Sequence, residues 1–528
     1  MAIQDIRLIS NIRTPDDSPL YVIRKDFSGG VNSKQHASTI GENQAEVLYN
    51  TDLSVLGETS KRLGSTLIGN DVGDVSPVCL HNFEVQGSDD QLLMYENTTI
   101  WKWVGSGNWS SLKADFTAST DVGIISAKES GLSPDDIVIV QNDTDNAFRI
   151  DSAGNIQDLG STSGTGSDSP PKSTVMCWYG NRIWVLLNDL LYFSSAYSSD
   201  YSSAFDTVAD VFRLPVGEER VIIPTRDTGM VVMGKEQIWG LNPSAVPVAT
   251  DKPEPLITNM GVVSKKGAVS YGDSIYFFSQ DGFRELKRTI QDKLQVGISY
   301  PLSYRLKTQW DRISWANIEK LSMVAWDNKI FISVPTSSTA FDTWVYYPAI
   351  DAFMVITGWS PTCWSTFKVS GEERLYYGQV SQGKVNRAWY GYTDEGATTT
   401  TGTAITMTID SREENLGQPL IYKVGGELEI EAEVAGSGNS LTINVALDGG
   451  SFQNLGTVSL SSTTAPTLPI SLPFNLSDSY VVRDKFHLES LGRFRTIQVE
   501  IINSDENTDP IKVYGYNITS FQEAYENE

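Results

Sequence analysis

A short pattern of polar turn residues, then an apolar residue and usually an aromatic one, recurs along the chain. Gly, Asn or Asp supplies the turn in most copies, and an apolar run of strand length follows. These turn residues accept the positive φ of a tight hairpin, and Ile beside an aromatic residue favours a strand. The clear copies cover residues 96–101, 179–184, 234–239, 271–276 and 326–331, and weaker copies cover 134–138 and 371–376.

The apolar residue of each copy gives an anchor from which the period can be measured. The anchors are residues 100, 137, 183, 238, 275, 330 and 375, and their mean spacing is close to 46 residues. A four-stranded propeller blade needs about 40–50 residues. We therefore predict an all-β protein built on a β-propeller of six to eight blades, and we favour seven. A generic meander of β-strands is the alternative.

Changes in the pattern divide the chain into four parts. Residues 1–34 show little periodicity and are predicted to form an N-terminal arm, followed by the β-propeller over 35–395. A Thr-rich linker at 396–402 ends the repeat. Beyond it, apolar and polar residues alternate strictly, for example in 428–434. This alternation predicts a separate C-terminal β-sandwich over 403–528.

The N-terminal region carries apolar residues without an evident partner in their own segment. Ile6, Leu8 and Ile12 are therefore candidates for docking on a neighbouring subunit or another protein. Residues 42–48 are expected to form two helical turns. The chain shows no basic stretch and apolar core of a signal peptide, and no apolar run approaches the ~20 residues of a membrane-spanning helix.

The chain is strongly acidic, with 40 Lys and Arg against 65 Asp and Glu and a formal net charge of −25. Such a surface repels phosphate, so tight or sequence-specific binding of nucleic acid is not expected. DNA could still slide past it, because few cationic contacts would hold it. Basic residues gather only at 61–62, 265–266 and 287–288, which we expect on a solvated face. Contact with a partner's carboxylates or with DNA is their alternative role.

Groups that could carry catalysis or bind a metal are sparse. The three cysteines, Cys79, Cys177 and Cys363, lie far apart in apolar runs, which predicts buried unpaired thiols. The three histidines have no spacing typical of a metal site. Adjacent carboxylates at 135–136 and 413–414 would point to opposite faces of a strand, so they cannot act as a glycosidase pair.

Known catalytic fingerprints are also missing from the sequence. Residues 279–283 come near the repeated turn of sialidase-like propellers, but the turn occurs once and is predicted to be a plain hairpin. Motifs for acyl transfer, phosphoryl transfer and dinucleotide binding do not occur. We therefore predict that the chain is not an enzyme and uses no cofactor or metal.

Several short segments carry a pattern known from one family. The first runs through 26–32 (DFSGGVN), 42–50 (ENQAEVLYN), 56–57 (LG) and 61–64 (KRLG). Others are 191–194, 229–233, 237–241, 260–264, 274–278, 281–283 and 491–498. In these segments the chain resembles the nozzle family of short-tailed bacteriophages, also called tail tubular or packaged-DNA stabilisation proteins.

The resemblance implies a structural component of the virion tail, assembled in the host cytoplasm. The family forms a hexameric ring at the distal end of the tail, below the adaptor and portal and beside tail fibres or spikes. Such a ring continues the DNA channel, retains packaged DNA and serves genome ejection. From the charge, we expect a channel lined by acidic and neutral side chains, through which DNA passes without sequence-specific binding.

Two other functions are compatible with the sequence. A tail hub or adaptor protein of a long-tailed phage would share the fold and have different neighbours. A glycan-binding propeller involved in host attachment would stack sugars on aromatic side chains such as Trp101, Trp103, Trp359 and Trp364. Packing between blades is the other role open to these tryptophans, and the more expected one.

Overall fold

In the computed structural model, the regular secondary structure consists almost entirely of β-strands. It describes residues 19–87, 89–160, 168–225, 229–247, 251–288, 294–296, 300–395, 402–435, 438–460, 481–505 and 511–522. The chain divides into two compact units. One, called here the propeller unit, contains Leu63–Thr403. The other, called the sandwich unit, combines Met1–Arg62 with Ala404–Glu528.

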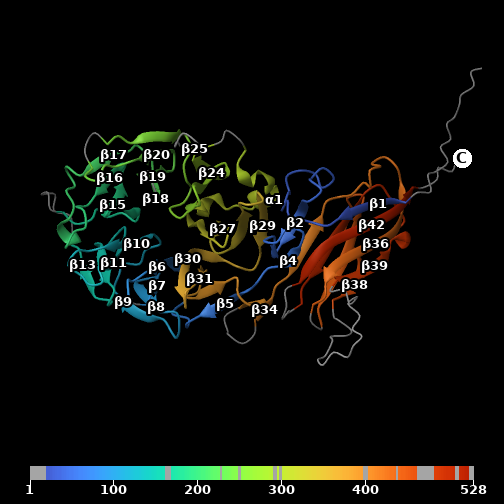
Figure 1. Cartoon of the computed structure of the whole chain (residues 1–528), viewed down its shortest axis with the longest axis horizontal. Helices are drawn as coiled ribbons and strands as arrows, with labels where there is room; N and C mark the ends of the chain where they lie inside the picture. Colours follow the sequence, from blue (N-terminus) through green and yellow to red (C-terminus); the bar gives the residue numbers. More distant parts are fainter. Residues whose placement is uncertain are drawn as a thin grey trace, which may run out of the picture. The chain divides into compact units, whose positions relative to one another are not determined.

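The propeller unit is a ring of four-stranded antiparallel sheets (Figure 1). The first three are β6–β9 (Pro77–Phe83, Gln91–Glu96, Thr99–Trp103, Ser110–Lys113), β10–β13 (Val122–Lys128, Asp136–Asn142, Phe148–Asp151, Ile156–Asp158) and β14–β17 (Met176–Tyr179, Arg182–Leu187, Leu190–Phe193, Val211–Arg213). The next three are β18–β21 (Glu219–Thr225, Gly229–Gly234, Gln237–Leu241, Glu254–Thr258), β22–β25 (Ala268–Tyr271, Ser274–Ser279, Gly282–Arg288, Leu294–Val296) and β26–β29 (Ser322–Trp326, Lys329–Pro335, Phe341–Tyr347, Ala352–Ile356). The last contains β30 (Pro361–Val369), β31 (Glu372–Gln379), β32 (Val385–Ala388) and β5 (Ser65–Ile68).

The first strands of successive sheets contact one another in the order β6, β10, β14, β18, β22, β26, β30 and back to β6. Six small sheets and the four strands β26–β29 therefore close into one ring with seven blades among the described residues. The propeller fold is confirmed, with a blade number inside the expected range. Short helices interrupt the strands at η1 (Tyr201–Ser203), η2 (Leu302–Arg305), α1 (Lys307–Trp310) and η3 (Trp315–Lys320).

The anchors of the sequence pattern fall once in each blade. Those at 137, 183, 275, 330 and 375 lie on second strands, whereas those at 100 and 238 lie on third strands. This difference contributes to the uneven spacing of the anchors. The turns behave as predicted: in the β14–β15 hairpin, Gly180 and Asn181 have φ of 59° and 58°.

The ring closes through a strand from the start of the propeller unit. β5 pairs antiparallel with β32, so the outermost strand of the last blade precedes all other blades in sequence. Gly64 leads into β5 where a Cβ would lie 1.9 Å from the carbonyl oxygen of Thr393, so only glycine fits there. Two short strands, β33 (Thr393–Glu395) and β34 (Gly402–Ala404), follow the last blade.

The sandwich unit contains two sheets. One has the order β3-β4-β42-β36-β39, with β1 pairing with β42 and β40 with β36. The other contains β2-β35-β41-β37-β38. The strands are β1 (Leu20–Arg24), β2 (Ala45–Tyr49), β3 (Thr51–Asp52), β4 (Thr59–Lys61), β35 (Met407–Ser411), β36 (Lys423–Glu433), β37 (Ser440–Leu447), β38 (Gln453–Ser459), β39 (Val481–His487), β40 (Arg493–Phe494), β41 (Ile497–Asn503) and β42 (Lys512–Gln522), with the short helix η4 (Glu489–Leu491).

The structure differs from the sequence prediction in the N-terminal region. The propeller starts at Leu63 instead of residue 35, because strands β1–β4 pair with C-terminal strands of the sandwich unit. Residues 45–49 form β2 and not the expected helix, because pairing with β35 outweighs local helix propensity. Of the expected linker, 396–401 lie outside the described residues. No helix in the described ranges is long and apolar enough to cross a membrane.

Candidate functional site

A polar cluster crosses the propeller's central opening near the start of the first strands of its blades. Lys265 and Lys266 lie just before β22, the first strand of the fifth blade. The Lys265 ammonium contacts the carboxylate of Asp121, before β10, and lies 2.8 Å from Thr174 Oγ1, before β14. The Lys266 ammonium contacts the carbonyl oxygen of Val78 on β6. Because none of these three partner blades neighbours the fifth blade, both lysines reach across the opening.

We expect the Lys265 contact to stabilise the propeller measurably. The Lys265 and Asp121 side chains are 29% and 30% exposed, so water screens the pair only in part. Lys265→Met should lower the free energy of unfolding by about 1–2 kcal/mol. Urea denaturation followed by tryptophan fluorescence measures this, because all 13 tryptophans lie in the propeller unit.

The control for Lys265→Met is Lys287→Met, which removes the same charge from the same blade at a side chain that is 70% exposed. Its effect should stay within about 0.5 kcal/mol. Introducing Asp121→Asn into the wild type and into Lys265→Met completes a double-mutant cycle for this ion pair. A coupling energy near zero would contradict the role given to this ion pair.

The other basic pairs do not all occupy the solvated face that we expected. Lys61 and Arg62 are only 4% and 2% exposed. Lys61 Nζ donates to Asn503 Oδ1 at 2.8 Å, and Arg62 Nε donates to Asn50 Oδ1 at 2.9 Å. The expectation is therefore wrong for 61–62, where the cations satisfy buried oxygens within the sandwich unit.

The glycine-rich opening motif also has an internal role. Asn32 N donates to the carbonyl oxygen of Ala45 at 2.8 Å, and Ala45 N donates back to that of Gly30 at 3.1 Å. A Cβ at Gly29 would lie 2.8 Å from the carbonyl oxygen of Asn43. These contacts hold the segment 29–32 against the start of β2, so the motif contributes to the fold of the sandwich unit.

The three cysteines lie on first strands of three blades. Cys79 is on β6, Cys177 on β14 and Cys363 on β30, and all three are free thiols. Burial raises the pKa of each thiol, to about 12 for Cys363. A thiol with so high a pKa is a poor nucleophile.

The adjacent carboxylates are used in ion pairs. Asp135 and Asp136 both contact Lys128 Nζ, at 2.8 and 3.2 Å. Glu414 accepts two hydrogen bonds from the Arg24 guanidinium, at 2.6 and 2.9 Å. Glu413 accepts a hydrogen bond from a threonine hydroxyl. Each carboxylate therefore has a structural partner, which accounts for its presence without catalysis.

The sialidase-like turn and the tryptophans also take structural positions. Residues 279–282 form the turn of the β23–β24 hairpin. Trp103, Trp359 and Trp364 are buried, whereas Trp101 is half-buried. The Trp359 indole donates to Asp394 Oδ1 at 2.7 Å, and Trp103 packs in a cluster with residues of the first and last blades. These rings contribute to packing within and between blades.

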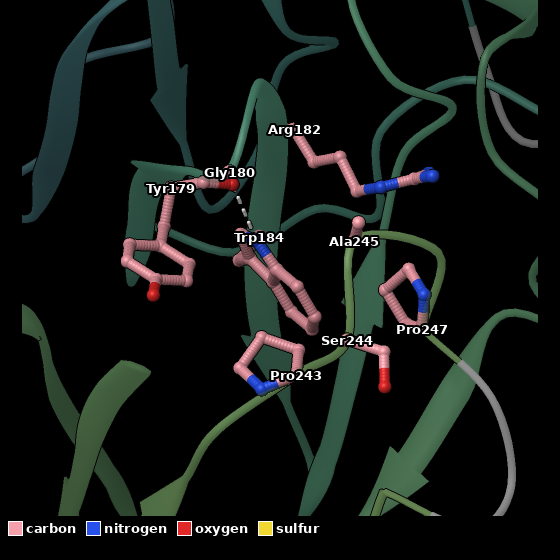
Figure 2. Close-up of a pocket in the computed structure, with 8 residues that line it drawn as sticks. All are labelled: Tyr179, Gly180, Arg182, Trp184, Pro243, Ser244, Ala245 and Pro247. Atoms are coloured by element: carbon pink, nitrogen blue, oxygen red, sulfur yellow. Dashed lines mark hydrogen bonds between the residues drawn. The ribbon is translucent and has the colours of Figure 1, made fainter. Parts of the chain in front are cut away.

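One pocket lies between the third and fourth blades (Figure 2). The β14–β15 hairpin contributes Tyr179, Gly180, Arg182 and Trp184. The segment after β20 contributes Pro243, Ser244, Ala245 and Pro247. The cavity has a volume of about 280 Å³. The Trp184 indole is held in place by a hydrogen bond of 3.0 Å to the carbonyl oxygen of Tyr179.

An apolar surface runs along one edge of the sandwich unit. Tyr21 and Ile23 on β1 are 69% and 51% exposed, and Phe521 at the end of β42 is 47% exposed. Tyr21 pairs with Thr519 in the register, so Phe521 shares its face of the sheet. We call Tyr21, Ile23 and Phe521 the β1 surface. Among the described strands, β1 pairs only with β42, so its outer edge has no strand partner.

An ionic stripe lies on β36 of the same sheet. Leu428, Ile430 and Ala432 are fully buried, and the intervening glutamates point to the other face. These glutamates pair with basic residues of neighbouring segments; the pairs are Glu427–Lys485, Glu429–Lys485, Glu431–Arg483, Glu431–Lys25 and Glu433–Lys512. The strict alternation in the sequence thus separates a buried apolar face from a charged one.

The three candidate docking residues Ile6, Leu8 and Ile12 lie outside the described residues, so their role stays a prediction. Within the described ranges, no group of three or more His, Cys, Asp and Glu side chains could hold a metal ion. The residues that sequence reasoning missed are Arg182 in the pocket and the β1 surface.

No protein-family model and no curated protein sequence matches the chain. Among solved structures, BBS1N, crystallised in complex with ARL6DN, is 10% identical over 62% of this chain and 97% of its own, with a TM-score of 0.41. An exo-β-1,3-galactanase from Phanerochaete chrysosporium is 10% identical over 87% of this chain and 99% of its own, with a TM-score of 0.29. PorZ from Porphyromonas gingivalis is 9% identical over 69% of this chain and 44% of its own, with a TM-score of 0.37. Similarity at this level carries no information about function.

Proposed function

We propose that the chain is a non-enzymatic structural subunit of a short-tailed phage tail, which forms a nozzle ring with further copies of itself. The observation that carries this proposal is the β1 surface, an exposed apolar face beside a strand edge that no other described strand pairs with. A single soluble chain gains nothing from exposing such an edge, which invites pairing with another chain. The family resemblance of the opening segment supports the same assignment.

The occupant proposed for the β1 surface is a second copy of this chain. β1 directly follows residues 1–18, the segment that contains the apolar side chains Ile6, Leu8 and Ile12. Contact between this segment and the β1 surface of the next copy would be heterologous, and repeated heterologous contacts form a ring when the rotation between copies closes. An apolar segment and an apolar strand edge are complementary, because each removes the other from water.

The negative charge supports passage of DNA without retention by the surface. With a net charge of −25, the chain offers DNA few cationic contacts. The two lysines that cross the propeller's central opening also bear on the path that DNA would take. Because Lys265 and Lys266 span that opening, DNA would pass through the channel of the subunit ring and not through a single propeller.

We expect charge on the β1 surface to prevent ring formation. Tyr21→Asp and Ile23→Asp together should convert a ring of several copies into single chains of 58.1 kDa. Desolvating these carboxylates in an apolar contact would cost several kcal/mol per subunit. Light scattering after size exclusion and negative-stain images of the full chain measure the assembly. Val208→Asp, at an exposed valine in the propeller unit, is the matched control and should leave rings intact.

Two results would contradict the proposal. The first is a wild-type chain that stays monomeric at micromolar concentration, and the second is a double variant that assembles as before. Either result would show that the β1 surface does not mediate assembly. Strong DNA binding with a steep salt dependence would contradict the proposal that DNA passes without being held, because such binding requires many phosphate contacts.

A further inference from the structure

The pocket between the third and fourth blades contains an unusual arginine. Arg182 is only 9% exposed, and its Nε is buried without a hydrogen-bond partner. One terminal nitrogen, Nη1, donates to the carbonyl oxygen of Ser194 at 2.6 Å. The guanidinium also lies over the ring of Phe193, with 5.7 Å to the ring centroid.

Two other largely buried arginines, Arg149 and Arg220, are paired with carboxylates. Arg149 lies 2.6 Å from Glu129, and Arg220 lies 3.0 Å from Glu218. For Arg182, no carboxylate within the described ranges lies within the 4.0 Å of an ion pair. Burial without such a partner lowers the pKa of Arg182, and only the more distant Asp210 opposes this effect. A buried cation without a counter-ion is costly in any protein.

The pocket places this cation beside a lining that is partly polar and partly apolar. Figure 2 shows the Arg182 side chain beside Ala245. Tyr179 and the two prolines Pro243 and Pro247 are half-buried and line the remaining walls. The volume of about 280 Å³ lies below the range of drug-sized sites, so it suits one small ring and not a longer chain.

We propose that this pocket binds a sugar acid, with the guanidinium of Arg182 pairing with the carboxylate and the aromatic and proline walls packing on the sugar ring. Arginine is well suited to this role, because its planar fork matches the geometry of a carboxylate. Among the described residues the terminal nitrogen Nη2 has no hydrogen-bond partner and is not buried, so it supplies the donor that the protein leaves unused. This site is separate from the β1 surface, so it stands independently of the assembly proposed above.

Calorimetric titration of the full chain with glucuronate tests the site. We expect saturable binding with a dissociation constant in the millimolar range or tighter. Glucose, which has the same ring without the carboxylate, should bind at least about tenfold more weakly. Acetate, which has the carboxylate without the ring, should also bind at least about tenfold more weakly. Equal binding of glucose or of acetate would overturn the proposal.

Two variants locate the binding. Arg182→Gln should weaken glucuronate binding at least about tenfold, whereas Arg213→Gln, at an exposed arginine of the same blade, should leave it unchanged. Ala245→Trp fills the pocket from an exposed position and should abolish binding while the melting temperature stays at the wild-type value. Glucuronate binding that survives in Ala245→Trp, or no detectable binding by the wild type at about 20 mM, would overturn the proposal.

Discussion

Replacing Ile68 by aspartate is expected to unfold the propeller unit at urea concentrations that leave the wild type folded. Ile68 lies on β5, which closes the ring by pairing with β32. Its side chain is 9% exposed and packs with Trp103, Trp109 and Val385. A carboxylate at this position would be buried without a partner, and the apolar contacts of isoleucine would be lost. The expected destabilisation is about 3–5 kcal/mol.

Tryptophan fluorescence during urea denaturation reports this effect, since every tryptophan belongs to the propeller unit. Thr66→Asp places the same charge on the same strand at a half-buried side chain and should cost less than about 1 kcal/mol. If both variants were equally stable, closure of the ring by β5 would contribute little. The stability of the propeller would then come from contacts within and between the other blades and not from the pairing of β5 with β32.

The second large effect concerns Asp410 in the sandwich unit. Asp410 lies on β35 between Glu46 on β2 and Glu500 on β41. Its Oδ1 is buried without a hydrogen-bond partner. Burial, followed by the charges of Glu500 and Glu46, raises the pKa of Asp410 from its ordinary value of 3.8 to about 7. The folded chain therefore disfavours the ionised carboxylate.

The direction of the pH dependence follows from this pKa. Below pH 3.8 the carboxyl is neutral in both states, and its stabilising contribution is fully present. As the pH rises towards 7, the unfolded chain ionises first, so stability is lost by up to about 1.4 kcal/mol per pH unit. Above pH 7 the loss is complete. Partial exposure of Asp410 reduces the total to about 1–3 kcal/mol.

Asp410→Asn should therefore stabilise the sandwich unit by about 1–3 kcal/mol at pH 8 and hardly at all at pH 4. The amide can also donate to the neighbouring glutamates. Hydrogen exchange of peptides covering β35 and β41, followed by mass spectrometry, measures this stability separately from the propeller. Asp484→Asn, at an exposed position on β39, is the control. A stability difference that is the same at both pH values would contradict the account.

The propeller could be predicted from the sequence because its signal is local. Each blade contains a tight hairpin whose turn residues, such as Gly180 and Asn181, are recognisable without knowledge of the fold. The count of anchors therefore reflects the number of blades. Burial within the blades follows from the apolar runs after each turn.

The N-terminal strands could not be predicted in the same way. β1 pairs with β42, almost 500 residues later in the chain, and no local pattern records such a partner. Two of its five residues, Tyr21 and Ile23, are apolar yet exposed, so the usual separation of apolar and polar faces is missing. β2 consists largely of residues that also suit a helix, and its pairing with β35 decides the outcome.

The binding pocket was hidden for a different reason. Arg182 occupies a position of the repeated turn where other copies carry Thr99, Gln237 or Lys329. An arginine in a hairpin next to an aromatic residue gives no sign that it is buried. Only the three-dimensional structure shows that the side chain lines a cavity and forms no ion pair with a carboxylate of the described segments.

The position of the propeller within the sequence determines how the chain carries mechanical load. The propeller unit is inserted between Arg62 and Ala404, so tension applied to the two chain ends enters only the sandwich unit. Leu20 lies opposite Ser520 in the antiparallel pair of β1 and β42, so pulling on the ends separates these strands one residue pair at a time. This peeling requires little force, and it shields all seven blades. In a single-molecule stretching experiment, release of β1 should therefore come first, at low force, with the propeller still folded.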